Sequence, residues 1–492
     1  MSLKLKFFFQ TPLYFKAFAI SVLFFKTNPF INSLSIMTIM TLITAIWGAA
    51  LTFENILICF RRIKTLYFLL FALFAISYSV TIVINIGPEL LKNVQDLVWF
   101  IISVFYLMGS SVTREENQQE YWNLLKIFLC YSFLFAAVSV PFVFLNMGGS
   151  ADWGRWGFYS NRLFGVYRSP NYGSLYCSVS LAVSLYMLST DRFNNTKLHR
   201  SFFIINSVFQ VLYIIYSGSN TGKVTLTVGL AMFLVYLVAI KRIFIKKGFV
   251  LLMVALVVVL VPFMFYTVRT VTTWIVTSYN RSSPDISTQT VELQGSNVLT
   301  GHDVVKINKL PSENLDDASS SVIEYKNISL NMSFSLDRAD TQKYGLANGR
   351  LHNWRVGLTV FKNYPFFGTS MREYANIAKG YDSSWRTQSR TATLENDFIS
   401  LLACTGVVGT LFFIAAASVV LFRIIRCLIK KIKRKQMHQL SNVWMPLTIV
   451  FIIGVTMLFT DAIVLTNTLQ SALFWISLGV VLKQVEIINI ER

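Results

Sequence analysis

The chain has 492 residues, 54% of them hydrophobic, and carries 44 Lys and Arg against 24 Asp and Glu. Soluble domains are roughly 45–50% apolar and rarely contain repeated apolar runs of about 20 residues. This chain contains many such runs, which excludes a soluble globular protein. A transmembrane β-barrel would instead show alternating segments of about ten residues. The predicted fold class is therefore all-α, as a polytopic membrane protein.

The positive charge lies in short loops between apolar runs, such as "KRIFIKK" (241–247) and "RIIRCLIKKIKRK" (423–435). Cytoplasmic loops that face anionic lipid have this pattern, so a membrane surface is favoured over nucleic acid as the partner. The five cysteines lie in apolar runs or beside basic loops. Their spacing matches no metal site and requires no disulfide. We therefore expect neither a metal nor a nucleic-acid partner.

Twelve membrane spans are predicted from the apolar runs. They lie near 8–25, 33–53, 65–84, 92–111, 123–145, 171–188, 201–216, 220–240, 248–268, 397–422, 443–464 and 467–482. The first is interrupted by Lys16 but has no small-residue cleavage site, so it is expected to remain as a span rather than act as a signal peptide.

The distribution of basic residues predicts the orientation of the chain. If the N-terminus is cytoplasmic, the strongly basic short loops and the C-terminus all lie on the cytoplasmic side, as the positive-inside rule requires. Three polar stretches then face outward, at 146–170, 217–220 and 269–396. The predicted organisation is an N-terminal bundle of about nine spans (1–268), a large outer loop (269–396) and a C-terminal bundle of three spans (397–492).

The amino-acid composition of the large loop changes along its length. Its middle, about 281–345, is rich in Ser, Asn and Asp and predicts an irregular insert. In 349–363 apolar residues recur at helical spacing, and Pro365 follows where a helix would stop. This predicts an amphipathic helix. Its arginines fit either a helix lying on the membrane surface or a binding site.

Three outward blocks differ from ordinary connecting loops. They are "NRLFGVYRSPNYGSLYCSVSLAVSL" (161–185), "YSGSNTGKVTLTVGL" (216–230), and the pair "NGRLHNWRVGLTVFKNYPFFGTS" (348–370) with "TLENDFISLLACTGVVGTLFF" (393–413). Their order and side of the membrane resemble the O-antigen ligase and polymerase family of bacterial surface-polysaccharide assembly. The residues that carry the resemblance are Arg162, Gly165, Pro170, Asn171, Gly349, Arg350, Trp354, Pro365, Gly368, Asn396, Phe398, Ile399, Gly406 and Gly409.

The resemblance implies an integral-membrane glycosyltransferase of the bacterial cytoplasmic membrane. Such an enzyme transfers a glycan from a polyprenyl-pyrophosphate carrier to a sugar hydroxyl on the outer face, without a metal or nucleotide cofactor. A pyrophosphate leaving group needs its developing charge stabilised, which guanidinium groups do with fixed donors. Arg350, which matches the family's loop arginine, and Arg162 are the candidates for this role. Glu395 stands where ligases carry His and is the candidate base, or else only a charge on the first helical turn.

Further candidates for substrate binding lie in the same blocks. Lys223 could supply the charge that the family often places at Asn220, or it could reach the outer interface as a surface lysine. Asp461 lies near the outer end of span eleven, and an acid at membrane depth is a functional candidate. The full set of substrate-binding candidates is Arg168, Asn171, Asn220, Lys223, His352, Trp354, Arg355, Asn396 and Asp461.

The predicted function is polymerisation of lipid-linked repeat units for capsule, exopolysaccharide or a related surface glycan. Flippase and chain-length regulator proteins are the expected protein partners. The alternatives are a ligase that transfers a finished glycan to an acceptor, and a flippase for the lipid-linked oligosaccharide. Transporters usually place charges inside their spans, whereas the arginines here lie in outward loops, which favours surface chemistry.

Overall fold

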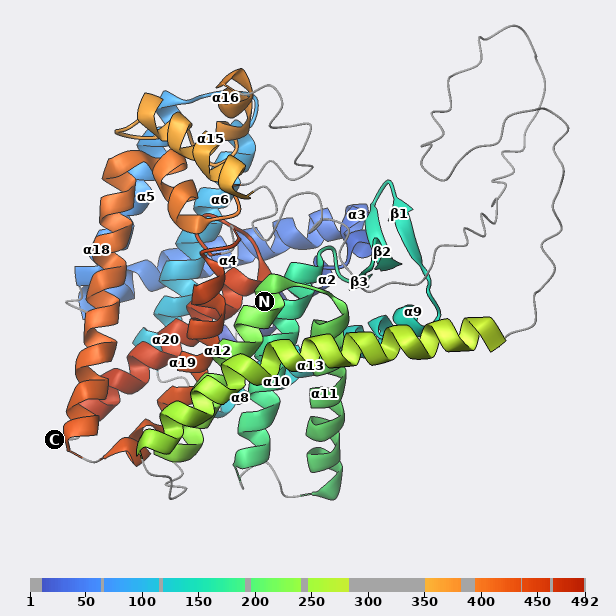
Figure 1. Ribbon diagram of the computed structural model, residues 1–492. Coiled ribbons are helices and arrows are strands. Elements are labelled where there is room, and N and C mark those ends of the chain that lie inside the picture. Colours follow the sequence, from blue (N-terminus) through green and yellow to red (C-terminus); the bar gives the residue numbers. More distant parts are fainter. Residues whose placement is uncertain are drawn as a thin grey trace, which may run out of the picture. The chain divides into compact units, whose positions relative to one another are not determined.

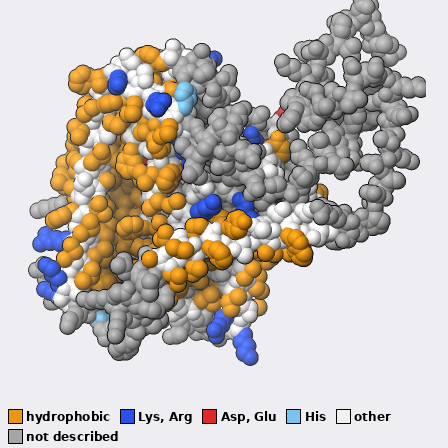
Figure 2. Space-filling model, viewed as in Figure 1, with side chains coloured by type: hydrophobic (Ala, Val, Ile, Leu, Met, Phe, Trp, Pro, Cys, Tyr) orange, Lys and Arg blue, Asp and Glu red, His pale blue; other side chains and the backbone are white. Residues whose placement is uncertain are grey.

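Helices form most of the computed structural model, which describes residues 11–62, 66–114, 118–190, 196–239, 247–282, 350–381, 394–434, 436–460 and 463–490 (Figure 1). Ten of the described helices are long and apolar enough to cross a membrane. The chain is thus an all-α, multi-pass membrane protein, as predicted. Figure 2 shows hydrophobic side chains over much of the viewed face of α18 and α13, as lipid-facing helices require.

The elements follow one another in chain order with few strands among them. They are α2 (Pro12–Phe25), α3 (Pro29–Ser33), α4 (Ser35–Arg62), α5 (Leu66–Ile84), α6 (Leu90–Ile101), the π-helix η1 (Ile102–Met108), α7 (Gly109–Thr113), α8 (Gln118–Ser139), α9 (Pro141–Phe144), β1 (Gly148–Ala151), β2 (Gly154–Tyr159), β3 (Arg162–Gly165), α10 (Pro170–Ser189), α11 (Lys197–Tyr216), α12 (Asn220–Ala239), α13 (Lys247–Ser282), α15 (Arg350–Asn363), α16 (Tyr374–Tyr381), α18 (Asp397–Lys433), the 3-10 helix η3 (Met437–Leu440), α19 (Ser441–Thr456) and α20 (Leu469–Ile490).

Two of the predicted spans form helices that are not among the ten. Helix α2 has 14 residues, and α10 has full length but contains five serines, which lower its hydropathy. Helix α10 packs against α8, α11, α12 and α19, and most of its residues are buried. Serines of α10 form hydrogen bonds with neighbouring helices. For example, Asn206 on α11 donates hydrogen bonds to Ser180 and Ser184. Polar side chains inside a membrane bundle find partners on neighbouring helices rather than facing lipid.

Lys16, which interrupts the first predicted span, is buried inside the bundle. Its Nζ donates a hydrogen bond to Ser111 Oγ on α7 at 2.8 Å. A lysine inside a span is costly unless it faces the protein interior and has a partner. The lysine is therefore compatible with α2 as part of the bundle.

The stretch 146–170, predicted to face outward and to have no secondary structure, contains a three-stranded antiparallel sheet in the order β1-β2-β3. The β2–β3 hairpin turns at Ser160 and Asn161, which both have positive φ, as a tight two-residue hairpin turn demands. Gly165 also has positive φ and approaches Ser139 so closely that a Cβ would lie 2.1 Å from its Oγ. Arg162 is thereby placed at the first position of β3.

Helix α18 is broken at Gly406, whose φ is +63° and ψ −169°. The segment that follows α15 pairs with the backbone at this break: Val407 N–H donates to Pro365 O at 2.7 Å, and Thr369 N–H donates to Ala403 O at 3.1 Å. A Cβ on Gly368 would lie 2.5 Å from Cys404 backbone. Gly368 and Gly406, two of the glycines that carry the family resemblance, therefore lie in one close backbone contact between two chain segments.

A small apolar core joins α15 and α16 to the start of α18 (Figure 1). Its buried residues are Val356, Val360, Tyr374, Ala375, Ala378, Leu394, Ala403 and Cys404. Helix α15 thus does not lie alone on the membrane surface but packs onto α18 through one face. Its exposed face carries Leu351, Arg355 and Leu358.

The chain divides into one unit of residues 1–271 with 336–492 and a second of residues 272–335. Of the second unit the structure describes only 272–282, the end of α13, which continues past the predicted end of its span at 268. The predicted irregular insert at 281–345 lies almost wholly outside the described residues.

Candidate functional site

The first cluster of polar residues joins the start of α15 to the start of α18. Arg350, the first residue of α15, donates from Nε to Glu395 Oε2 at 2.9 Å, and both belong to the predicted catalytic set. The Arg350 side chain is 10% exposed and also lies over the Phe459 ring, with 5.9 Å from Cζ to the ring centroid. Within the described residues its other guanidinium N–H groups make no hydrogen bond. They are available to an anion.

Glu395 is held in an unusual backbone conformation. Its φ is +51°, in the left-handed region, where a residue with a long side chain costs roughly 1–3 kcal/mol. The next two residues anchor the turn. Asn396 Oδ1 caps α18 by accepting from Phe398 N and Ile399 N, and Asp397 Oδ2 accepts from Ile463 N. Of the three consecutive polar residues, Glu395 is the one that reaches Arg350.

The second cluster lies where β3, α10 and α12 begin. Arg162 donates from Nε to Ser217 O at 3.1 Å and from Nη2 to Asn171 Oδ1 at 3.2 Å. Asn171 Oδ1 also accepts from Ser219 Oγ at 2.8 Å. The first and second sequence blocks therefore meet around one guanidinium group, which three separate elements fix in place.

The third cluster was missed by the sequence analysis, apart from Arg168. Arg372 forms a two-pronged ion pair with Asp96, Nε to Oδ2 at 2.7 Å and Nη2 to Oδ1 at 2.9 Å. Asp96 is buried, and Lys26 and Arg168 are close enough to interact with it or with one another electrostatically. The cluster thus contains three cations and the Asp96 carboxylate, with Glu89 close enough to interact with Arg372, so positive charge is in excess.

Lys26 directly follows α2, and the environment of this cluster changes its pKa. Burial lowers the pKa of Lys26 to about 8, and the positive charges of Arg168 and Arg372 contribute. The carboxylate of Asp96 acts in the opposite direction. Within the described residues the Lys26 ammonium has no hydrogen bond or ion pair. A second anion at this place would relieve the repulsion among the cations.

Backbone contacts hold Arg372 over the ends of α5 and α6. Its N–H donates to Asn93 Oδ1 at 2.9 Å, and Met371 N–H donates to Tyr78 OH at 3.0 Å. Glu373 Oε1 accepts from Glu89 N–H at 2.8 Å. The sequence did hold one signal for this cluster: Asp96 is an acid within a span, the property that drew attention to Asp461.

The remaining predicted residues have varied positions. Asn220 begins α12, and Lys223 Nζ lies 5.5 Å from the Phe265 ring centroid. On α15, His352 and Trp354 are partly buried, whereas Arg355 is exposed. Asp461 lies outside the described residues. Among the side chains that the structure describes, no three His, Cys, Asp or Glu residues gather as in a metal site.

The comparison with protein families matches residues 205–414 to the family described as O-antigen ligase. The matched range extends from α11 to the first half of α18 and so contains Arg350, Glu395 and Arg372. Arg162 and Lys26 precede it. The comparison with curated proteins found no match.

Proposed function

Because residues 205–414 match the O-antigen ligase family, we propose that this chain is a polymerase of polyprenyl-pyrophosphate-linked oligosaccharide repeat units at the outer face of the cytoplasmic membrane. The family makes it a membrane enzyme of the ligase or polymerase type that acts on a lipid-linked glycan. Polymerisation, the pyrophosphate donor and the residues that act on it are the parts that we propose.

The Arg350–Glu395 pair carries the proposal, because it combines the two groups that the reaction needs. The acceptor hydroxyl oxygen forms a bond to the anomeric carbon of the donor sugar while the bond from that carbon to the pyrophosphate oxygen breaks. The electron pair leaves with the lipid pyrophosphate, whose charge the open N–H groups of Arg350 stabilise. The hydroxyl proton passes to the Glu395 carboxylate.

The positive end of the α18 helix dipole adds to this stabilisation. Glu395 immediately precedes Asn396, the residue that caps α18. Helix N-termini favour negative charge by roughly 0.3–1 kcal/mol at exposed sites. Both a bound pyrophosphate and the Glu395 carboxylate would benefit, and the ion pair with Arg350 holds the carboxylate in place until substrate arrives.

A second cationic cluster favours a polymerase over a ligase. A polymerase must hold two lipid-linked pyrophosphates, one on the donor glycan and one on the acceptor repeat. A ligase needs to hold only the donor. We assign the donor pyrophosphate to Arg350 and the second one to Lys26, Arg168 and Arg372, whose net positive charge supports this role. Arg162 would orient the glycan between them through its fixed guanidinium group.

The experiment uses the purified protein in lipid nanodiscs with the lipid-linked repeat as the single glycan substrate. A polymerase should produce a ladder of chain lengths without any other acceptor, whereas a ligase should produce none until its acceptor is added. Arg350→Ala should abolish the ladder. Arg350→Lys should also lose most activity, because a point charge replaces a planar fork of donors.

Lys362→Ala is the matched control. This exposed cation lies in the last turn of the same helix as Arg350 and should leave the ladder unchanged. If Arg350→Ala makes wild-type amounts of polymer, Arg350 serves only to anchor α15. If product appears only with a separate acceptor, the enzyme is a ligase.

A further inference from the structure

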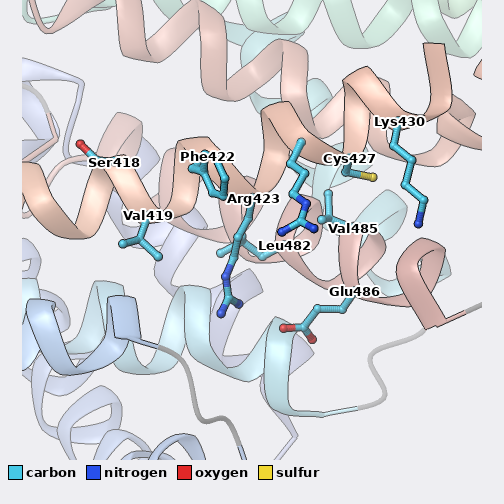
Figure 3. Close-up of a pocket in the computed structure, with 10 residues that line it drawn as sticks. Ser418, Val419, Phe422, Arg423, Cys427, Lys430, Leu482, Val485 and Glu486 are labelled. Carbon is cyan, nitrogen blue, oxygen red and sulfur yellow. The ribbon is translucent and has the colours of Figure 1, made fainter. Parts of the chain in front are cut away.

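A pocket of about 660 Å³ lies between α18 and α20 (Figure 3). Its lining on α18 begins at Ser418, 21 positions after the first residue of the helix. Its polar lining consists mainly of Arg423, Arg426 and Lys430 on α18 and Glu486 on α20. The family resemblance involves none of these residues, and the proposed reaction uses none of them. The proposed reaction therefore does not explain why cations gather in this pocket.

The three cations follow the spacing i, i+3 and i+7, which places them on one face of α18. The Arg423 guanidinium lies over the Tyr67 ring, with 5.2 Å from Cζ to the centroid. Arg426 is exposed and has no hydrogen bond or ion pair in the part of the chain that the structure describes. Glu486 is the one carboxylate that lines the pocket together with these three cations, and of the three it interacts electrostatically with Arg423, so positive charge is in excess.

The depth of the pocket along α18 corresponds to a lipid headgroup region. Arg423 follows the break of α18 at Gly406 by 17 positions, or about 26 Å at 1.5 Å per residue. The hydrocarbon core of a bilayer is roughly 30 Å thick. If the break of α18 lies near one edge of this core, the pocket lies among the headgroups of the opposite leaflet, which is the cytoplasmic one in the predicted orientation.

The pocket also has an apolar side that continues onto the lipid-facing surface. Val419, Phe422, Leu482 and Val485 line it, and Phe422 is 63% exposed. A soluble anion would make no favourable contact with this apolar surface. A phospholipid would place its phosphate against the arginines and its acyl chains along Val419 and Phe422.

We propose that this pocket binds an anionic phospholipid of the leaflet opposite to Glu395, with preference for a lipid that carries two phosphates. Guanidinium groups bind phosphate oxygens through paired N–H donors, and basic pockets between membrane helices suit such headgroups. Two phosphates match the three cations better than one does. Glu486 opposes binding and limits the affinity.

The test measures lipid that remains bound to the full-length protein by native mass spectrometry. The protein is purified in detergent and supplied with diphosphatidylglycerol, phosphatidylglycerol or phosphatidylcholine. The wild type should retain diphosphatidylglycerol most and phosphatidylcholine least. Arg426→Gln, at an exposed position, should weaken retention about tenfold, and Arg423→Gln with Arg426→Gln should weaken it further.

Lys433→Gln with Arg434→Gln is the matched control, because these exposed cations lie on the same helix but do not line the pocket. The control should retain lipid as the wild type does. Glu486→Gln should strengthen retention, because it removes the one opposing charge. Equal retention by the wild type and the double arginine variant would overturn the proposal, as would equal binding of phosphatidylcholine. Complete displacement of the lipid by millimolar inorganic phosphate would identify a soluble anion as the ligand instead.

Discussion

Glu395 Oε2 and Arg350 Nε lie 2.9 Å apart although 45 positions separate the two residues in the chain. The contact exists because α15 packs onto the first turns of α18, while Glu395, with its left-handed φ, lies directly before the residue that caps α18. Residues in strained conformations of this kind concentrate at functional sites. The pair places a cation and a carboxylate together, and the proposed reaction would use both.

The role of Glu395 as the proton acceptor predicts a large loss of turnover in Glu395→Gln, which keeps the shape and removes the basicity. General-base catalysis is typically worth about 10²–10⁴-fold in rate, so polymer formation from purified lipid-linked repeat should fall by that order. Donor binding should survive. Glu395→His, which restores the residue found in ligases, should retain partial activity.

Glu54→Gln, at an exposed position on α4, is the control for this substitution and should have wild-type turnover. Unchanged turnover in Glu395→Gln would remove Glu395 from the mechanism. The carboxylate would then be a charge near the helix N-terminus, worth only about 0.3–1 kcal/mol of stability.

We expect both Arg162→Ala and Arg162→Lys to lose activity, because the guanidinium donates hydrogen bonds to Ser217 O and Asn171 Oδ1 from two different nitrogens of one planar group. We expect polymer formation to fall at least tenfold in Arg162→Lys, while the amount of folded protein stays close to wild type. Arg168→Ala should have a smaller effect, since Arg168 is exposed and shares its cluster with two other cations. Arg155→Lys, an exposed arginine on the neighbouring strand β2, should be silent.

The lowered pKa of Lys26 predicts that binding of the second lipid-linked substrate depends on pH near neutrality. A lysine at its ordinary pKa of about 10.4 stays charged throughout this range. Lys26, with a pKa of about 8, loses its proton as pH rises from 7 to 9, so affinity for a pyrophosphate lipid should fall over that interval. Binding measured by titration at fixed ionic strength should show this decline.

Lys26→Arg should keep the affinity and abolish the decline, because a guanidinium stays charged at all these pH values. The same decline in Lys26→Arg as in the wild type would mean that another group titrates. Bound pyrophosphate itself raises the pKa of Lys26, so the midpoint should move upward at saturating ligand.

The close backbone contact between Gly368 and the break of α18 at Gly406 predicts that Gly368→Ala and Gly406→Ala destabilise the fold. Both glycines have positive φ, and a Cβ on either would lie within 2.6 Å of backbone atoms across the contact. The strained φ alone costs on the order of 1–3 kcal/mol, and the clash adds to it. Thermal unfolding in detergent should therefore begin at a lower temperature.

Gly380→Ala is the matched control, because a Cβ at Gly380 meets nothing within 4 Å and its φ is ordinary. It should leave the unfolding temperature unchanged or raise it slightly, since Ala favours helix over Gly. An equal response of all three variants would show that this backbone contact contributes nothing beyond ordinary glycine effects.

The predicted orientation can be tested in a background without the five native cysteines. An impermeant thiol reagent applied to intact cells should label Thr300→Cys and Gly380→Cys but leave Ile245→Cys unlabelled. After the cells are opened, all three should react. Labelling of Ile245→Cys from outside would reverse the orientation and place Arg350 and Glu395 on the cytoplasmic side.

The sequence by itself determined that this is a helical membrane protein. Charged side chains and unpaired backbone groups are costly in lipid, so each span must be a helix of about 20 mostly apolar residues, and such a run can be recognised without knowledge of its neighbours. It also indicated Arg350, Glu395 and Arg162, because these lie in short motifs with recognisable order. It did not indicate the sheet at 148–165, whose strands are short and whose turn is formed by Ser160 and Asn161 rather than glycine.

Only the tertiary structure decided which of these residues meet. Arg372 and Asp96 are separated by 276 positions, and neither belongs to a motif, yet they form a close two-pronged ion pair. Gly368 and Gly406 appear in the sequence as separate motifs, and their mutual contact is visible only where one chain segment enters the break of a helix. Contacts of this kind depend on how the membrane helices pack side by side, and residues far apart in the chain become neighbours only through that packing.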